Sequence, residues 1–266
     1  MRVNARQCEQ SFAKQRTGCF WSCCQRRATG QHDRIMNPDS SSSSSASFSA
    51  LRWSLPFQVQ VAYSTVTDGD QRDRGNRHAW LASHQVKRCT VPRQVHGVRI
   101  VHADADAAAL AQADGVVSND PAIALGVYGA DCPGLILVTP DACGVAHGGW
   151  RGVAGGIVAQ LVAAMRTVTG HPSAHWAAFI GPGISAAHYE VDQQVLSARV
   201  WPSSALTPGR PGYAQLDIAG AIASDLLAYD VTNVHRSEIC TAKDSRLWSY
   251  RRRGAGSVQL LAAWRR

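Results

Sequence analysis

The chain has 266 residues, of which 45% are hydrophobic and 17% are charged, and its formal net charge is +8. This composition is typical of a soluble globular protein, and it holds no uninterrupted apolar stretch of the roughly 18 residues that a membrane-spanning helix requires. Half of the excess positive charge lies in residues 1–50, and the remainder has no basic stripe interleaved with aromatic residues. We therefore expect neither nucleic acid nor a membrane as the main partner.

Residues 1–50 end in the run SSSSSASFSA and show no apolar periodicity. Such a segment cannot bury enough apolar surface to fold, so we predict a disordered, basic, serine-rich tail over residues 1–50 and one domain over residues 51–266. We find no apolar core of a secretory signal in the tail. We therefore expect a cytoplasmic protein whose cysteines are reduced thiols.

The predicted elements of the domain begin with residues 58–63 (QVQVAY), which alternate like a half-buried strand. The polar stretch 64–77 contains an Asp-Gly pair and is typical of a loop. Apolar runs predict further strands at residues 93–102, 113–118, 122–128, 135–138, 143–146, 176–180, 231–235 and 258–263. Helices are predicted at residues 152–167, after an N-cap at Asp192, and at 216–227. Strand pairs mixed with helices favour an α+β fold with mixed sheets.

Three side chains are candidates for a shared metal ion: His96 in RQVHG, Cys132 in GADCPG and His147 in GVAHGGWRG. Each is predicted to lie where a strand stops and a loop begins, and active-site residues concentrate in such places. Two imidazoles and a thiolate suit Zn²⁺, and three ligands leave a fourth position for water or substrate, as in catalytic zinc sites. Taken singly, a buried cysteine is more often a packing residue, and a lone histidine at a strand end is more often a hydrogen-bonding group than a ligand.

Arg151 follows the glycine pair of His147-Gly-Gly-Trp-Arg and stands at the start of the helix predicted from residue 152. A helix N-terminus and a planar guanidinium both favour an anion such as phosphate. A glycine turn with a solvent-facing arginine explains the same residues. Tyr189 and Glu190 follow a second glycine turn, and they either line a pocket or only pack that turn. The segment WSYRRR at residues 248–253 adds aromatic surface and cations to the same mouth, or is a solvated basic turn.

Taken in order, these segments resemble the YfiH-like family, also called the laccase-domain or polyphenol oxidase-like family. The matching pieces are RQVHG, ADGVVS, GADCPGLIL, GVAHGGWRG, FIGPGISAAHYEV and CTAKDSRLWSYRRR. The resemblance implies layered α/β/β/α-type mixed sheets, similar to the catalytic domain of cytotoxic necrotizing factor toxins. It implies one metal ion, zinc or else copper, bound by His96, Cys132 and His147. We accordingly expect Cys132, His147 and Arg151 to be catalytic, and Arg151, Tyr189 and Glu190 to bind substrate.

Members of this family are described as purine nucleoside phosphorylases acting on adenosine, inosine, guanosine and methylthioadenosine, and adenosine deaminase activity is also ascribed to them. The resemblance thus implies purine nucleosides and phosphate as partners of a monomer or homodimer. Two cationic positions of the family are missing here. The stretch 64–77 lacks the usual arginine, and residues 255–257 read AGS in place of TGR. These departures bear on substrate preference and rate but leave the metal ligands unchanged.

Several mechanisms remain open from the sequence. In phosphorolysis, phosphate held near Arg151 attacks the ribose C1′ while the purine departs. In deamination, zinc activates water for attack on adenine C6, although no HxE signature supplies the usual glutamate. Alternatively, Cys132 is a metal-independent nucleophile activated by His147 or His96, acting on an amide or ester as in peptidoglycan editing. Copper-based phenol oxidation needs many more histidines. A further alternative is a non-catalytic module that binds nucleosides at a vestigial site.

Overall fold

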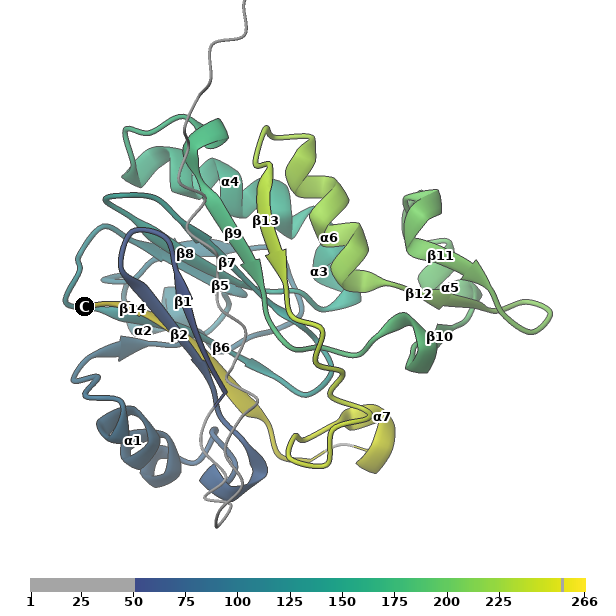
Figure 1. Cartoon of the computed structure of the whole chain (residues 1–266), viewed down its shortest axis with the longest axis horizontal. Helices are drawn as coiled ribbons and strands as arrows, with labels where there is room; N and C mark the ends of the chain where they lie inside the picture. The colour runs from purple at the N-terminus through teal and green to yellow at the C-terminus, as the bar shows by residue number, and fades with distance from the viewer. Residues whose placement is uncertain (1–50, 255) are drawn as a thin grey trace, which may run out of the picture. The chain divides into compact units, whose positions relative to one another are not determined.

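The computed structural model describes residues 51–254 and 256–266, so the tail predicted over residues 1–50 lies outside the described residues. In the described domain, two large mixed sheets pack face to face, with helices on their outer sides (Figure 1). A search of the described helices finds none that is long and apolar enough to cross a membrane.

The first sheet has five strands in the order β1-β2-β14-β6-β3. They are β1 (Leu51–Leu55), β2 (Val59–Tyr63), β14 (Gln259–Arg265), β6 (Ala124–Gly129) and β3 (Cys89–Thr90). The last strand, β14, lies between β2 and β6 and runs antiparallel to both, whereas β3 is parallel to β6. The sheet therefore joins the two ends of the domain by backbone hydrogen bonds.

The second sheet has six strands in the order β13-β9-β7-β8-β5-β4. They are β13 (Asn233–Arg236), β9 (Ala177–Ile180), β7 (Gly134–Val138), β8 (Cys143–His147), β5 (Gly115–Ser118) and β4 (Ile100–His102). The inner pairs are antiparallel and both outer pairs are parallel. A small third sheet contains β10 (Glu190–Val191), β12 (Ala214–Leu216) and β11 (Leu206–Pro208).

Five of the seven described helices begin where an aspartate or serine side chain accepts a hydrogen bond from a free backbone N–H group, whereas α3 and α4 begin after glycines. They are α1 (Arg74–Ser83), α2 (Ala107–Leu110), α3 (Trp150–Ala154), α4 (Ile157–Val168), α5 (Gln193–Leu196), α6 (Ile218–Leu227) and α7 (Tyr250–Arg253). Single 3₁₀ turns span Val66–Asp68, Ser173–His175, Ala186–His188 and Ser203–Ala205. Asp192 caps α5 as predicted, and Asp217 caps α6 in the same way.

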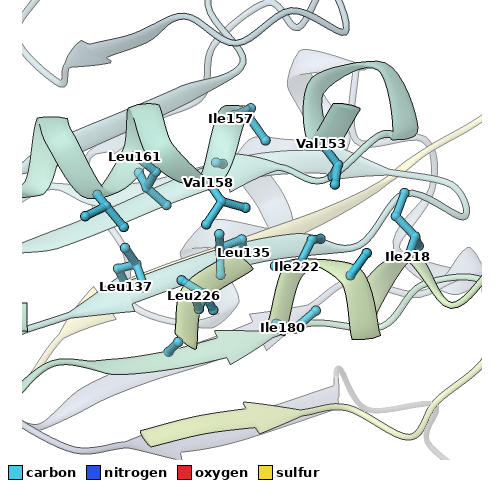
Figure 2. Packing of buried hydrophobic residues seen from close by; sticks show 14 of the residues in the cluster. Leu135, Leu137, Val153, Ile157, Val158, Leu161, Ile180, Ile218, Ile222 and Leu226 are labelled. Carbon is cyan, nitrogen blue, oxygen red and sulfur yellow. The ribbon is translucent and has the colours of Figure 1, made fainter. Parts of the chain in front are cut away.

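The layers follow from strands that are apolar on both faces. Leu135 and Leu137 of β7 pack against α4 and α6 (Figure 2), whereas Ile136 and Val138 face the five-stranded sheet. Burial of each such side chain contributes about 1.5–3 kcal/mol relative to exposure. On the outer side of the five-stranded sheet, Trp80 of α1 packs against β2 and β14. The order helix, sheet, sheet, helix confirms the predicted α+β architecture of mixed sheets.

Three predicted boundaries are wrong. The helix predicted over residues 152–167 is two helices, because Gly156 adopts φ 92° and ends the first after Ala154. The strand predicted over residues 93–102 is only β4, and the part before it is a loop in which His96 has φ 61°. The loop predicted over residues 64–77 already contains the start of α1, because Asp73 caps a helix there.

Candidate metal centre

The fold brings His96, Cys132 and His147 together at one edge of the six-stranded sheet. One ligand atom from each lies within 4.8 Å of the other two, and among the described residues only these three form such a group. His147 ends β8, and Cys132 lies in the turn that enters β7, whose Gly134 is paired with His147. His96 comes from the loop that precedes β4. His147 is buried and His96 exposed, so the centre opens to solvent on the His96 side.

Asp114, directly before β5, holds the backbone at one histidine and the ring of the other. Its fully buried carboxylate accepts hydrogen bonds from the backbone N–H groups of His96 (2.8 Å), Gly97 (2.8 Å) and Val95 (3.2 Å). His147 Nδ1 lies 3.2 Å from Asp114 Oδ1. Because an ionised carboxylate can only accept, Nδ1 carries the proton and Nε2 of His147 is left for a metal ion. One carboxylate thus sets the position of one ligand loop and the tautomer of the second ligand.

Asp131 performs a comparable task for Cys132. Its buried carboxylate accepts hydrogen bonds from Thr241 Oγ1 (2.6 Å), Ser249 Oγ (3.0 Å) and the backbone N–H of Arg251 (2.6 Å). The residue adopts φ 91°, a strained conformation for a residue with a side chain. These three hydrogen bonds hold the turn in that conformation and so present the neighbouring thiol to the centre.

Gly149 lies against all three ligands. A Cβ atom built on it would lie 3.0 Å from His147 Cε1, 3.2 Å from His96 Cδ2 and 3.4 Å from Cys132 Sγ. Any residue can adopt its φ of −68°, so the backbone conformation does not require a glycine at this position. The absence of a side chain leaves room for the ligands to meet.

The charges at the centre favour a deprotonated thiol. Burial opposes ionisation, but the charge of His147 and hydrogen bonds from His147 and His96 lower the pKa of Cys132 to about 6. Burial also opposes the charge on His147, yet the Cys132 thiolate and Asp114 raise the pKa of His147 to about 9. A thiolate and an imidazolium therefore face each other. A cation taken up here would displace the imidazolium proton, as expected when metals bind Cys and His.

The donor set fits one zinc ion. Donor atoms about 2.0–2.3 Å from a tetrahedral zinc lie roughly 3.3–3.8 Å apart, and these three already lie within 4.8 Å of one another. The second coordination sphere of His147 is in place, because Asp114 accepts the hydrogen bond that a zinc-bound histidine usually donates. Two nitrogen ligands and one thiolate also suit copper, so the donors alone do not select the metal.

The predicted substrate residues are not equally placed. Tyr189 is half-buried, and burial together with the charges of Cys132 and Asp131 raises the pKa of its phenol, while the charges of Arg251 and Arg151 act in the opposite direction. Arg151 is exposed, and its guanidinium carbon lies 4.3 Å from the ring centre of Trp150. Because α3 has only five residues, Arg151 itself offers more to an anion than the helix dipole does. The carboxylate of Glu190 is instead paired with Arg210 at 2.9 Å.

Three contributors to the site are missing from the sequence-based prediction. Asp114 appears there only inside the ADGVVS segment, Asp131 only inside GADCPG, and Arg251 only inside a basic run. Arg251 hydrogen-bonds the backbone oxygen of Glu190 at 3.1 and 3.2 Å, and its guanidinium carbon lies 5.4 Å from the ring centre of Tyr189. A short polar residue before the glycine of a buried strand is the signal that would have marked Asp114.

The family is now decided by comparison with known proteins. The family model described as multi-copper polyphenol oxidoreductase laccase matches residues 56–264. The chain belongs to this laccase-like family. The membership and the fold that the sequence motifs predicted are therefore confirmed.

Relatives within the laccase-like family carry a different activity in their names. A purine nucleoside phosphorylase of Deinococcus radiodurans is 35% identical over 162 residues, which are 60% of this chain and 62% of that protein, less than two thirds of its length. Purine nucleoside phosphorylase YlmD of Geobacillus stearothermophilus is 31% identical over 194 residues, 70% of this chain and 71% of that protein.

Solved structures of the family share the fold. The crystal structure of YlmD superposes with a TM-score of 0.72 at 25% identity, covering 84% of this chain and 98% of that chain. YfiH of Bacillus licheniformis superposes with a TM-score of 0.71 at 23% identity, covering 82% and 97%.

Proposed function

We propose that this chain is a metal-dependent purine nucleoside phosphorylase, with zinc held by His96, Cys132 and His147. The observation that carries the proposal is the convergence of these three side chains, one of them oriented by Asp114, at a site that is open to solvent on one side. The names of the relatives support the reaction, since both are purine nucleoside phosphorylases. The substrates proposed are adenosine, inosine, guanosine and methylthioadenosine, with inorganic phosphate as the second substrate. We place the enzyme in the cytoplasm, where its free thiols stay reduced.

Different residues around the centre would bind the phosphate and the nucleoside during phosphorolysis. Arg151 would bind phosphate through its planar guanidinium, and Arg251 adds positive charge close to Tyr189. Tyr189 offers a ring and a hydroxyl group to the nucleoside, and Glu190 holds Arg251 through its backbone oxygen. The phosphate oxygen then attacks the ribose C1′ while the bond to the purine breaks. A zinc ion would supply Lewis acidity and positive charge to a substrate oxygen.

The carboxylates of the site favour phosphorolysis over deamination. A deaminase needs a free carboxyl group as general acid and base. Asp114 and Asp131 are both occupied as acceptors, and Glu190 is paired with Arg210. Phosphorolysis needs cations for its anionic substrate, and two arginines supply them. Multi-copper oxidation receives no support, because the described residues contain a single His/Cys group of this kind.

The test is metal analysis joined to product identification. Purified protein is expected to hold about one zinc per chain and to convert adenosine to adenine and ribose 1-phosphate only when phosphate is present. Inosine formed without phosphate would indicate deamination instead. The proposal would be overturned if zinc-loaded protein converted none of the four nucleosides adenosine, inosine, guanosine and methylthioadenosine.

A matched pair of cysteine substitutions makes the test specific. Cys132→Ala is expected to abolish stoichiometric zinc and to lower turnover by at least about 100-fold, as loss of a ligand should. Cys89→Ala removes the same thiol group from β3, outside the centre, and should leave both unchanged. Covalent labelling of Cys132 by substrate in metal-free, active protein would favour the cysteine-nucleophile alternative.

A further inference from the structure

Two side chains that the proposed reaction does not use, Ser185 and His188, lie around a second thiol, that of Cys240. Ser185 Oγ lies 3.2 Å from Cys240 Sγ and 3.2 Å from His188 Nδ1, and the sulfur and Nδ1 are 3.7 Å apart. The backbone N–H of Ser185 also points to the sulfur, at 3.4 Å. Cys240 and Ser185 are partly exposed and His188 is exposed, so solutes reach this cluster.

The hydrogen bonds at this cluster favour negative charge on sulfur. Ser185 donates both its hydroxyl and its backbone N–H to Cys240, and a hydroxyl that donates to sulfur can accept from His188 Nδ1. Partial burial opposes ionisation, but these bonds and the N–H groups of Ala242 and Lys243 lower the pKa of the Cys240 thiol. A low pKa and solvent access together mark reactive cysteines.

Two other thiols of the domain have the opposite surroundings and serve as internal references. Burial raises the pKa of Cys89 to about 12, with only Arg77 acting against it. Burial likewise raises the pKa of Cys143 to about 12, opposed only by Arg265. Both are therefore thiols at neutral pH, and Cys132 is engaged by its two histidines. Cys240 is distinguished from Cys89 and Cys143 by geometry as well, through its serine and histidine neighbours.

We propose that Cys240, with Ser185 and His188, forms a modification site at which the thiolate reacts with hydroperoxides. The sulfur attacks one peroxide oxygen, so that an S–O bond forms and the O–O bond breaks. Sulfur loses two electrons and becomes a sulfenic acid, while the peroxide gains them. The departing oxygen, hydroxide from hydrogen peroxide or alkoxide from an organic hydroperoxide, takes a proton from His188 or from solvent and leaves as water or alcohol. Other thiols can reduce this sulfenic acid back to the cysteine thiol.

The location of Cys240 connects the modification to the metal centre. Cys240 forms a backbone bridge with Gly183, and the next residue, Thr241, donates to Asp131 beside Cys132. His188 directly precedes Tyr189 in the chain. An oxidised Cys240 therefore lies next to Thr241, which holds Asp131, and its sulfur lies 3.7 Å from His188, the residue before the predicted substrate tyrosine.

The experiment treats the zinc-loaded full-length protein with hydrogen peroxide in the presence of dimedone, which traps sulfenic acids. Tandem mass spectrometry then assigns the labelled residues. Cys240 is expected to be labelled at least about tenfold faster than Cys89 and Cys143, since a pKa lower by one unit raises the thiolate fraction about tenfold. Equal labelling of these three residues would overturn the proposal.

Variants separate activation by the cluster from simple exposure. Ser185→Ala and His188→Ala are each expected to slow labelling of Cys240 about three- to tenfold. His175→Ala, at another exposed histidine that ends a 3₁₀ turn, should not change the rate. Cys240→Ser should remove the label and keep the zinc content. Unchanged rates in both Ser185→Ala and His188→Ala would contradict an activated thiol, whatever the outcome of the nucleoside assays.

Discussion

Asp114 and Asp131 are two buried carboxylates that serve the same centre through different partners. Asp114 accepts from three backbone N–H groups of one ligand loop and contacts the ring of a second ligand, His147. Asp131 accepts from Thr241, Ser249 and Arg251, none of which is a predicted ligand. The first therefore controls ligand orientation directly, and the second controls the path of the backbone. Loss of Asp114 should damage metal binding, and loss of Asp131 mainly the folded state.

The largest effect is expected from Asp114→Ala. It leaves three backbone N–H groups and the Nδ1–H of the buried His147 without an acceptor, which should lower the free energy of unfolding by about 3–5 kcal/mol and metal affinity by about 10–100-fold. Urea unfolding and competitive zinc titration measure the two. Asp114→Asn keeps the shape and one carbonyl acceptor, so its losses should be smaller. Zinc affinity at the level of the unchanged protein in Asp114→Ala would refute the orienting role.

Gly149→Ala should separate ligand geometry from folding. The new methyl group meets all three ligands at 3.0–3.4 Å, while the backbone angle suits alanine. Crowding of about 1–3 kcal/mol should weaken zinc binding roughly tenfold or more, since 1.4 kcal/mol is a factor of ten.

Gly170→Ala is the control for that change, because a Cβ there has no neighbour within 4 Å. Its zinc affinity, measured by the same titration, should equal that of the unchanged protein. If Gly149→Ala also binds zinc normally, the ligands do not converge on an ion beside this glycine.

The smallest effect on the metal is expected from Asp131→Asn. Asparagine tolerates the positive φ but loses part of the acceptor capacity, so the free energy of unfolding should fall by about 1–3 kcal/mol. Zinc affinity should change by less than about threefold, because this carboxylate touches no ligand side chain. Asp230, exposed and with φ 63°, is the matched control, and Asp230→Asn should be near neutral. If Asp131→Asn lost more zinc affinity than Asp114→Ala, Asp131 rather than Asp114 would be the carboxylate that controls metal binding.

Much of the fold was predictable because its signals are local. Apolar runs such as those of β7 and β8 indicated buried strands, and Asp192 indicated a helix start, since burial on both faces and capping act over a few residues. The failures were also local in origin: the positive φ of Gly156 divides a segment with uninterrupted helical spacing. Periodicity does not report a single backbone angle.

The sequence by itself determined which side chains at the centre carry chemistry, since His96, Cys132, His147 and their glycine-rich surroundings are visible in short motifs. Only the tertiary structure decided that these side chains meet, that Asp114 assigns the tautomer of His147, and that Arg251 joins Tyr189. The physical reason is that strand pairing joins segments far apart along the chain, and no local propensity records which buried carboxylate will accept their hydrogen bonds. The same pairing places Cys240 beside Ser185 and His188, three side chains whose proximity no motif announces.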